Sequence, residues 1–154
     1  MLVKDIISPE LIACKINASS KKRALEKISE LLAKNNPAFN QQDIFESFLS
    51  REKLGSTALG HGVALPHGRL KSTDQTSGAF LQLDKGIDFD AEDQQPVDLI
   101  FAMLVPQEST EEHLKLLAQL AEMFSNKEFR EKLRAAENNN ELFGLLENWT
   151  TQPS

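Results

Sequence analysis

The chain has 154 residues, a formal net charge of −6, 40% hydrophobic residues and 26% charged residues, which suits one soluble domain with its own core. Its acidity argues against a nucleic-acid interface, because such an interface needs clustered Lys and Arg. No apolar run approaches the ~20 residues of a membrane helix and no signal peptide is visible, so we expect a cytoplasmic protein without membrane insertion.

The first predicted helix follows Ser19-Ser20 and ends at Asn35-Asn36-Pro37. Apolar side chains recur between these signals at helical spacing, at Ala24, Leu25, Ile28, Leu31 and Leu32. The chain's only basic run, Lys21-Lys22-Arg23, lies at the start of this helix. We expect it on the solvated face of the helix and not on phosphate.

The second predicted helix begins at Asn40, a favourable N-cap, and is closed by Gly55. Its apolar side is formed by Ile44, Phe45, Phe48 and Leu49. Arg51 follows Phe48 by three residues, so its side chain continues the inward-facing stripe instead of pointing squarely at water.

The middle of the chain changes from helical to strand patterning. Strands are predicted at residues 57–59, 63–65, 78–83 and 97–105, and residues 87–89 could add a short edge strand. Residues 99–105 are apolar without alternation, which is typical of a strand covered on both faces.

Three helices are predicted after this buried strand. Pro106 ends the strand, and Ser109 with Glu112 forms a capping box for a helix that continues through Phe124. Two more helices are predicted, at residues 127–136 and 141–149.

Together these patterns predict an α/β, three-layer domain over residues 1–150, with a mixed β-sheet of about five strands flanked by helices. Residues 151–154 are predicted to be a disordered tail. The single cysteine, Cys14, cannot form an internal disulfide, and no CxxC pair is present for zinc. We therefore expect neither a metal nor another cofactor.

The most unusual segment is residues 60–69, in which a short apolar run ends in Pro66 and His67 stands between that proline and Gly68. Proline fixes φ and removes a hydrogen-bond donor, while glycine permits backbone angles that other residues avoid. We therefore expect a tight turn that presents the imidazole of His67 to a ligand or partner. A histidine in an ordinary surface turn is the alternative.

Two further side chains are candidates for the same site. His113 lies near the start of the helix after the buried strand and precedes Leu116 and Leu120 at helical spacing, so it heads the inward-facing side. The N-terminus of that helix favours an anion, although His113 could instead pack over the core. Arg51 could reach the ligand that His67 faces, or only complement the dipole of its own helix.

Two imidazoles, an arginine and a helix N-terminus suit phosphoryl transfer, in which the protein mainly positions groups and neutralises charge. Histidine can be the nucleophile because its ordinary pKa near ~6.5 leaves a neutral nitrogen at cellular pH. No P-loop or protein-kinase motif is present, so a nucleotide is not the obvious donor. Metal-dependent hydrolysis by the three histidines is a weaker alternative, because neither HExxH spacing nor a paired acidic residue accompanies them.

From about Leu2 to Trp149, the chain resembles the enzyme IIA domains of the bacterial phosphoenolpyruvate-dependent phosphotransferase system, in the fructose–mannitol class. The landmarks are Ser50-Arg51-Glu52, Gly55-Ser56-Thr57, Val63-Ala64-Leu65-Pro66-His67-Gly68 and Glu112-His113-Leu114. Residues 18–26 further resemble the nitrogen-regulatory subgroup, which works without a transport domain.

The resemblance implies a role for each site residue. His67 would accept a phosphoryl group on Nε2 from the phosphohistidine of a small, HPr-like phosphocarrier protein. His113 would hydrogen-bond the phosphoryl group or orient the acceptor, Arg51 would stabilise charge, and Thr57 is a weaker candidate for a hydroxyl contact to phosphate. Regulatory targets such as kinases or transporters are the implied partners.

His61 departs from the family, which commonly has Asn or another polar residue at this position. Because Gly60 and Gly62 flank it, we expect His61 in an exposed turn before the strand. A third imidazole near the pocket could alternatively bind metal or tune the pKa of His67.

Three functions are compatible with these residues. The first is a regulator whose phosphorylation state controls partner binding, since phosphate adds nearly two negative charges and three acceptor oxygens. The second is a sugar-specific component that passes phosphate to a cysteine of a IIB domain, and the third is a binding module that never transfers phosphate. We favour the regulator because no IIB or membrane segment is attached to the domain.

Overall fold

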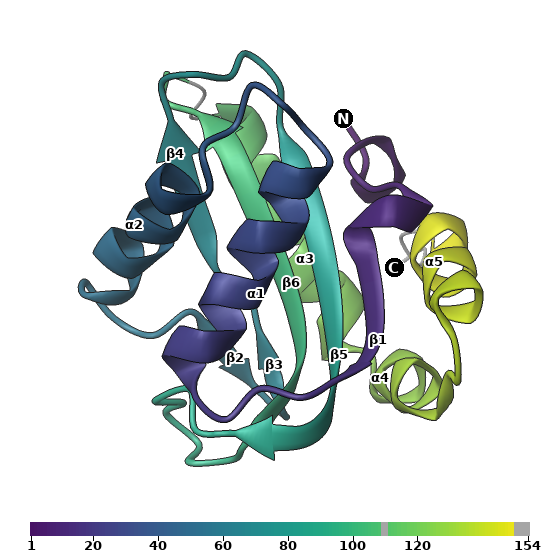
Figure 1. Cartoon of the computed structure of the whole chain (residues 1–154). Helices are drawn as coiled ribbons and strands as arrows, with labels where there is room; N and C mark the ends of the chain where they lie inside the picture. The colour runs from purple at the N-terminus through teal and green to yellow at the C-terminus, as the bar shows by residue number, and fades with distance from the viewer. Residues whose placement is uncertain (109–110, 150–154) are drawn as a thin grey trace.

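The computed structural model describes residues 1–108 and 111–149. One mixed sheet lies between two layers of helices (Figure 1), which confirms the predicted three-layer α/β fold. The sheet has six strands where about five were predicted. The predicted cap at Ser109 and the predicted tail at 151–154 lie outside the described residues.

Along the chain, one strand is followed by two helices, then by five strands and finally by three helices. The strands are β1 (Ile12–Ile16), β2 (Ala58–Gly60), β3 (Val63–Ala64), β4 (His67–Leu70), β5 (Ser77–Ile87) and β6 (Val97–Pro106). The helices are α1 (Lys21–Lys34), α2 (Gln41–Glu52), α3 (Glu111–Ser125), α4 (Lys127–Ala135) and α5 (Asn139–Asn148), and two short 3-10 turns, Val3–Asp5 and Pro9–Leu11, precede β1. In the described ranges no helix is long and apolar enough to cross a membrane.

The first two helices begin where their capping residues predicted. The side chain of Ser20 accepts a hydrogen bond from the backbone N–H of Arg23, and that of Asn40 accepts one from Asp43. Each cap satisfies one of the backbone donors that a helix N-terminus leaves unpaired.

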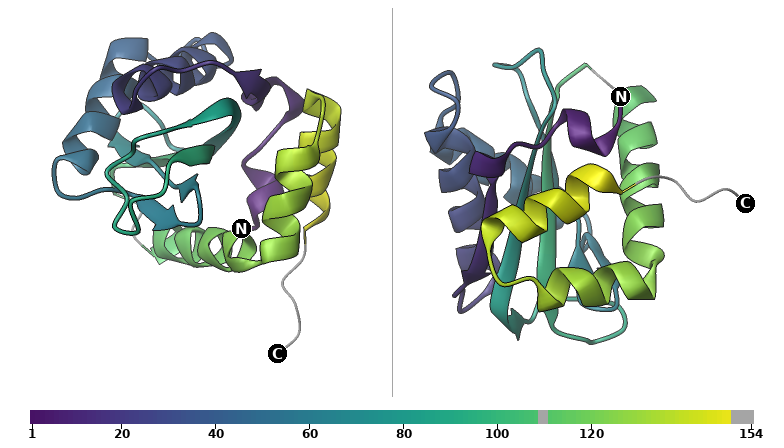
Figure 2. Two further views of the ribbon diagram at one scale, coloured as in Figure 1. Left: turned by 90° about the horizontal axis from the view of Figure 1, so that it is seen from below. Right: turned by 90° about the vertical axis from the view of Figure 1, so that its right-hand side faces the viewer.

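Strand β6 is the centre of the sheet, because it pairs with β3, β4 and β5. From Leu99 to Val105, its side chains alternate between two cores. Those packed with α3, α4 and α5 are Leu99, Phe101, Met103 and Val105. Those packed with α1 and α2 are Ile100, Ala102 and Leu104. Both faces of β6 are therefore covered, as its continuous apolar run predicted (Figure 2).

Strands β3 and β4 follow one another along the same edge of β6. Val63 and Ala64 pair in parallel with Leu99 and Ile100, and β4 then pairs from Met103 onward. Pro66 lies at the interruption, where it has no N–H to give to the ladder, although its carbonyl accepts from the N–H of Met103 at 2.9 Å. This interruption places the backbone of the candidate site beside Met103, toward the C-terminal end of β6.

Two strands were missed and one predicted strand was wrong. β1 pairs in parallel with β5 but contains a bulge with Lys15 in the left-handed region (φ 54°), so its side chains do not alternate regularly. β4 contains Gly68 and Arg69, which are not strand-favouring in sequence. Residues 87–89 form no separate strand, because Ile87 is the last residue of β5 and pairs with Val97.

The buried side chain of Gln82 joins three elements. Its Oε1 accepts from the backbone N–H of Lys15 at 3.0 Å and from the thiol of Cys14 at 2.9 Å. Its Nε2 donates to the carbonyls of Leu133 (2.8 Å) and Ala136 (2.9 Å). Gln82 therefore provides hydrogen-bond partners for the backbone N–H in the bulge of β1 and for two carbonyls at the end of α4 that lack helical partners.

We expect Gln82→Leu to destabilise the protein by about 2–4 kcal/mol, because a side chain of similar size would leave these buried backbone groups unpaired, at roughly 1–3 kcal/mol each. Urea unfolding followed by circular dichroism measures the change. Gln42→Leu, on the exposed side of α2, is the matched control and should change stability by less than about 0.5 kcal/mol. Equal stabilities for the two variants would contradict this role of Gln82.

Candidate active site

The imidazole of His67 is held by the backbone just before it. Nδ1 of His67 lies 2.9 Å from the carbonyl oxygen of Leu65. A carbonyl oxygen can only accept, so Nδ1 carries the proton and Nε2 carries the lone pair. Because Pro66 interrupts the ladder between β3 and β4, the Leu65 carbonyl is free to take this bond. The side chain of His67 is half-buried. His67 is the first residue of β4, although the sequence predicted a tight turn at this position.

Arg51 reaches the same imidazole from the end of α2. Its Nε donates to Nε2 of His67 at 3.1 Å, and its Nη1 donates to the carbonyl of Gly55 at 2.9 Å. The second bond anchors one arm of the guanidinium to the loop after α2. The guanidinium therefore keeps its positive charge beside Nε2, whose lone pair accepts the bond from Arg51.

Gly68 lets α2 approach β4 closely. A Cβ atom at this position would collide with the hydroxyl of Ser47 and lie 2.9 Å from its Cβ. Ser47 lies one helical turn before Arg51, so any larger residue at 68 would displace the part of α2 that carries the guanidinium. The glycine beside His67 is therefore explained by helix packing.

His113 approaches His67 from the other helix layer. It lies in the first turn of α3 and is only 6% exposed, and the centroids of the two imidazoles are 5.1 Å apart at an angle of 57°. Its Nδ1 is buried and has no hydrogen-bond partner among the described residues. The structure thus brings Arg51, His67 and His113 together, as the sequence predicted.

The pKa of each imidazole is lowered, which favours the neutral ring. Burial lowers the pKa of His67, and the guanidiniums of Arg51 and Arg69 lower it further, while the bond to the Leu65 carbonyl works in the opposite direction. Burial lowers the pKa of His113 to about 4, with smaller contributions from His67, Arg69 and Arg51. A neutral His67 keeps its Nε2 lone pair available for attack on an electrophile.

The low pKa of His113 predicts a loss of stability in acid. The pKa of an unfolded histidine is ~6.5, whereas that of the folded His113 is about 4. Between these two pH values the unfolded chain therefore binds a proton at this residue and the folded protein does not. This contribution to stability is complete above the unfolded pKa and is lost as the pH falls. We expect the wild type to lose about 2 kcal/mol more than His113→Gln between pH 7 and pH 5, by urea unfolding. Parallel pH dependences would contradict the burial of a neutral imidazole here.

The carboxylate of Glu52 organises the loop that follows Arg51. Its side chain is 5% exposed and pairs with Nζ of Lys21 at 2.9 Å. It accepts hydrogen bonds from the backbone N–H of Thr57 at 3.2 Å and from the Thr57 hydroxyl. The hydroxyl that we predicted as a phosphate contact is thus donated to Glu52 here, and its contact to phosphate stays a prediction. Lys21, expected on the solvated face, is instead half-buried in this network.

Arg69 is the cation that the sequence did not reveal. It lies in β4 two residues after His67, and side chains two apart in a strand share a face. Its Nη1 donates to the carbonyl of Gln107 at 2.9 Å, and its charge lowers the pKa of both His67 and His113. The spacing would have pointed to Arg69 if residues 67–70 had been predicted as a strand.

His61 lies outside this cluster. It occupies the turn between β2 and β3 with φ 58°, and its side chain is exposed, as predicted. Its backbone N–H donates to Oδ2 of Asp93 at 2.9 Å. Within residues 1–108 and 111–149, no three His, Cys, Asp or Glu side chains are grouped so that they could hold a metal ion.

The fold and the site together define an α/β domain with a neutral, backbone-oriented imidazole beside a fixed guanidinium. The model of the family "Phosphoenolpyruvate-dependent sugar phosphotransferase system, EIIA 2" matches residues 5–149. The chain belongs to this family.

Individual relatives agree with this assignment. The nitrogen regulatory protein of Pseudomonas aeruginosa is 44% identical over 144 residues, covering 94% of each chain. The crystal structure of the nitrogen regulatory protein IIA-Ntr from Neisseria meningitidis superposes with a TM-score of 0.87 at 41% identity, over 94% of this chain and 98% of the other. IIA mannitol from Escherichia coli gives a TM-score of 0.76 at 25% identity, over 91% and 98%. The resemblance to the nitrogen-regulatory subgroup is thereby confirmed.

Proposed function

We propose that this protein is a cytoplasmic nitrogen-regulatory IIA protein that accepts a phosphoryl group on Nε2 of His67 from an HPr-like phosphocarrier. Its phosphorylation state would then control binding to regulatory targets such as kinases or transporters. The observation that carries the proposal is the bond from Nδ1 of His67 to the Leu65 carbonyl, which leaves Nε2 as the nucleophilic atom beside Arg51.

The transfer needs one bond made and one bond broken. The Nε2 lone pair of His67 attacks the phosphorus of the donor phosphohistidine, and the donor's N–P bond breaks with its electron pair returning to the donor ring. The proton on Nδ1 stays in place, and the Leu65 carbonyl stabilises the positive charge that develops on the ring. The guanidinium of Arg51, held in place by the Gly55 carbonyl, would donate to the phosphoryl oxygens once Nε2 is bonded to phosphorus, with Arg69 as a second cation nearby.

Two exposed leucines flank the residues that carry this chemistry. Leu54, in the turn after α2, is 84% exposed, and Leu114, the neighbour of His113, is 65% exposed. Large apolar side chains next to a reactive group favour docking of a protein donor over a small one. A protein phosphocarrier fits such a surface.

Mass spectrometry after incubation with the two kinds of phosphocarrier tests the proposal. The chain is incubated with phosphoenolpyruvate and the general phosphotransferase proteins and, separately, with their nitrogen-branch paralogues. We expect one acid-labile phosphate per chain, added faster by the nitrogen branch. No incorporation from either donor would refute the proposed transfer.

The second candidate function is that of a sugar-specific component, which the structural similarity to IIA mannitol favours. It predicts that purified IIB domains remove phosphate from His67. A regulator should keep its phosphate under these conditions. For a binding module without transfer, His67→Ala would leave every partner interaction unchanged and no phosphate would be incorporated.

A further inference from the structure

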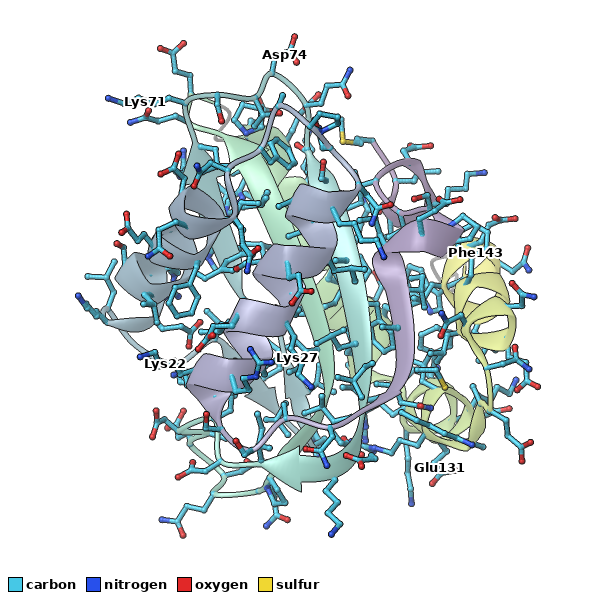
Figure 3. The ribbon with its side chains drawn as sticks, in the orientation of Figure 1. Lys22, Lys27, Lys71, Asp74, Glu131 and Phe143 are labelled. Carbon is cyan, nitrogen blue, oxygen red and sulfur yellow. The ribbon has the colours of Figure 1, made fainter. Side chains whose placement is uncertain are left out.

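A cavity with several charged lining residues lies at the other end of the sheet from His67. It has a volume of about 470 Å³, within the usual range for small-molecule sites, and is lined by the β2–β3 turn, the start of β6 and one side of α4. Asp98 at this cavity and Met103 beside His67 are five residues apart on β6, about 17 Å along the strand. Figure 3 shows Glu131 of α4 at this end and Lys71 and Asp74 at the opposite end.

Arg130 is a buried cation with no counter-ion in the part of the chain that the structure describes. It lines the cavity and is only 7% exposed, and among the described residues no carboxylate lies within ion-pairing distance of its guanidinium. Its Nη1 donates a hydrogen bond to the carbonyl of Phe124 at 2.8 Å. Buried charges are normally paired because an uncompensated one is costly. An anion bound in the cavity would supply the missing counter-charge of the guanidinium.

The neighbouring side chains complete a basic site. Lys127 lies three residues before Arg130 and Arg134 four residues after it, so all three cations share one side of α4. Arg134 is already neutralised by both carboxylate oxygens of Asp98, at 3.0 and 3.1 Å, and donates to the carbonyl of His61. Lys127 and Arg130 remain as the cations without a carboxylate partner among the described residues lining the cavity.

The turn before β3 contains a glycine that leaves room for the ion pair between Arg134 and Asp98. Gly62 has φ 81°, and a Cβ atom there would collide with Nη2 of Arg134 and lie 2.9 Å from Oδ1 of Asp98. The glycine thus keeps the ion pair against the turn, and His61 beside it contributes an exposed imidazole to the rim. The rim also carries the carboxylate of Glu131, which disfavours a polyphosphate.

We propose that this cavity binds a small organic phosphate monoester. The phosphate would be held by Arg130 and Lys127, with the imidazole of His61 as a further donor, because a guanidinium and an ammonium together match the two charges of a monoester. The cavity is larger than one phosphate group, so it leaves room for the hydroxyl-bearing part of such a ligand near Glu131. Binding there is independent of the phosphoryl transfer proposed for His67.

Titration of the unphosphorylated full chain with glycerol 3-phosphate, followed by ¹⁵N NMR, tests the proposal. We expect saturable shifts at the Arg130 side chain and at the amides of His61 and Lys127. Arg130→Gln should weaken binding roughly tenfold or more, because it removes a charge-assisted hydrogen bond. Lys127→Gln, an exposed position where loss of folding is not expected, should weaken it several-fold.

Two matched variants serve as controls. Lys132→Gln removes the same charge from α4 at a residue that pairs with Glu128 instead of lining this cavity, and should bind as the wild type does. His67→Ala should also bind normally, which separates this site from the phosphotransfer site. The proposal is overturned if the shifts are confined to His67 and Arg51, if Lys127→Gln binds as the wild type, or if succinate binds as tightly as the phosphate ester.

Discussion

His67→Ala is expected to abolish incorporation of acid-labile phosphate from phosphoenolpyruvate and the upstream carriers. The variant lacks Nε2 of His67, the unprotonated ring nitrogen that lies beside the guanidinium of Arg51. Because a general base or water cannot replace a nucleophile that itself carries the product, no partial activity should remain. Incorporation is measured with ³²P-labelled phosphoenolpyruvate on the intact chain.

The control for this experiment is His61→Asn. His61 contributes its backbone N–H and carbonyl to the fold and has an exposed side chain, and asparagine tolerates its positive φ. Phosphate incorporation should therefore match that of the wild type. Labelling that persists in His67→Ala, or that disappears in His61→Asn, would show that the acceptor has been assigned to the wrong histidine.

Arg51→Ala should slow phosphoryl transfer to His67 by roughly 10²–10³-fold, the usual cost of removing a fixed donor that stabilises transition-state charge. The guanidinium is held beside Nε2 by its bond to the Gly55 carbonyl, so its position is set before the donor arrives. Rapid-quench kinetics with a saturating phosphocarrier measure the rate.

Arg51→Lys separates charge from geometry. Lysine keeps the charge but cannot hold the Gly55 carbonyl and the phosphoryl group with one planar group, so an intermediate rate is expected. Arg23→Ala, an exposed residue of α1 paired with Glu26, is the control and should not change the rate. A rate for Arg51→Ala within a factor of three of the wild type would contradict the role of the guanidinium.

The helical part of the fold was predictable because its signals are local. Ser20 and Asn40 cap α1 and α2, and apolar spacing fixed their inward faces. The strands were less accessible, since β1 has a bulge at Lys15 and β4 begins directly after Pro66. Their pairing partners lie more than 30 residues away on β5 and β6, so tertiary contacts decide their conformation.

The three candidate residues that the structure brings together were also predicted, because Arg51 and His113 lie near helix ends and His67 follows Pro66 after an apolar run. Their mutual geometry was not. The bond from His67 to the Leu65 carbonyl depends on where the ladder along β6 is interrupted, which no residue pattern states. The role of Glu52 as a buried partner of Lys21 likewise depends on the packing of α1 against α2 and the loop after it.

The most direct test of the site concerns the ring atom that bears phosphorus. The chain is labelled with ¹⁵N-histidine, phosphorylated, and examined by ¹⁵N and ³¹P NMR. We expect phosphorus coupled to Nε2 of His67, with Nδ1 still protonated and hydrogen-bonded. The proposed chemistry depends on the orientation of the His67 ring by the Leu65 carbonyl. Phosphorus on Nδ1 of that ring, or on the imidazole of His113 or His61, would contradict it.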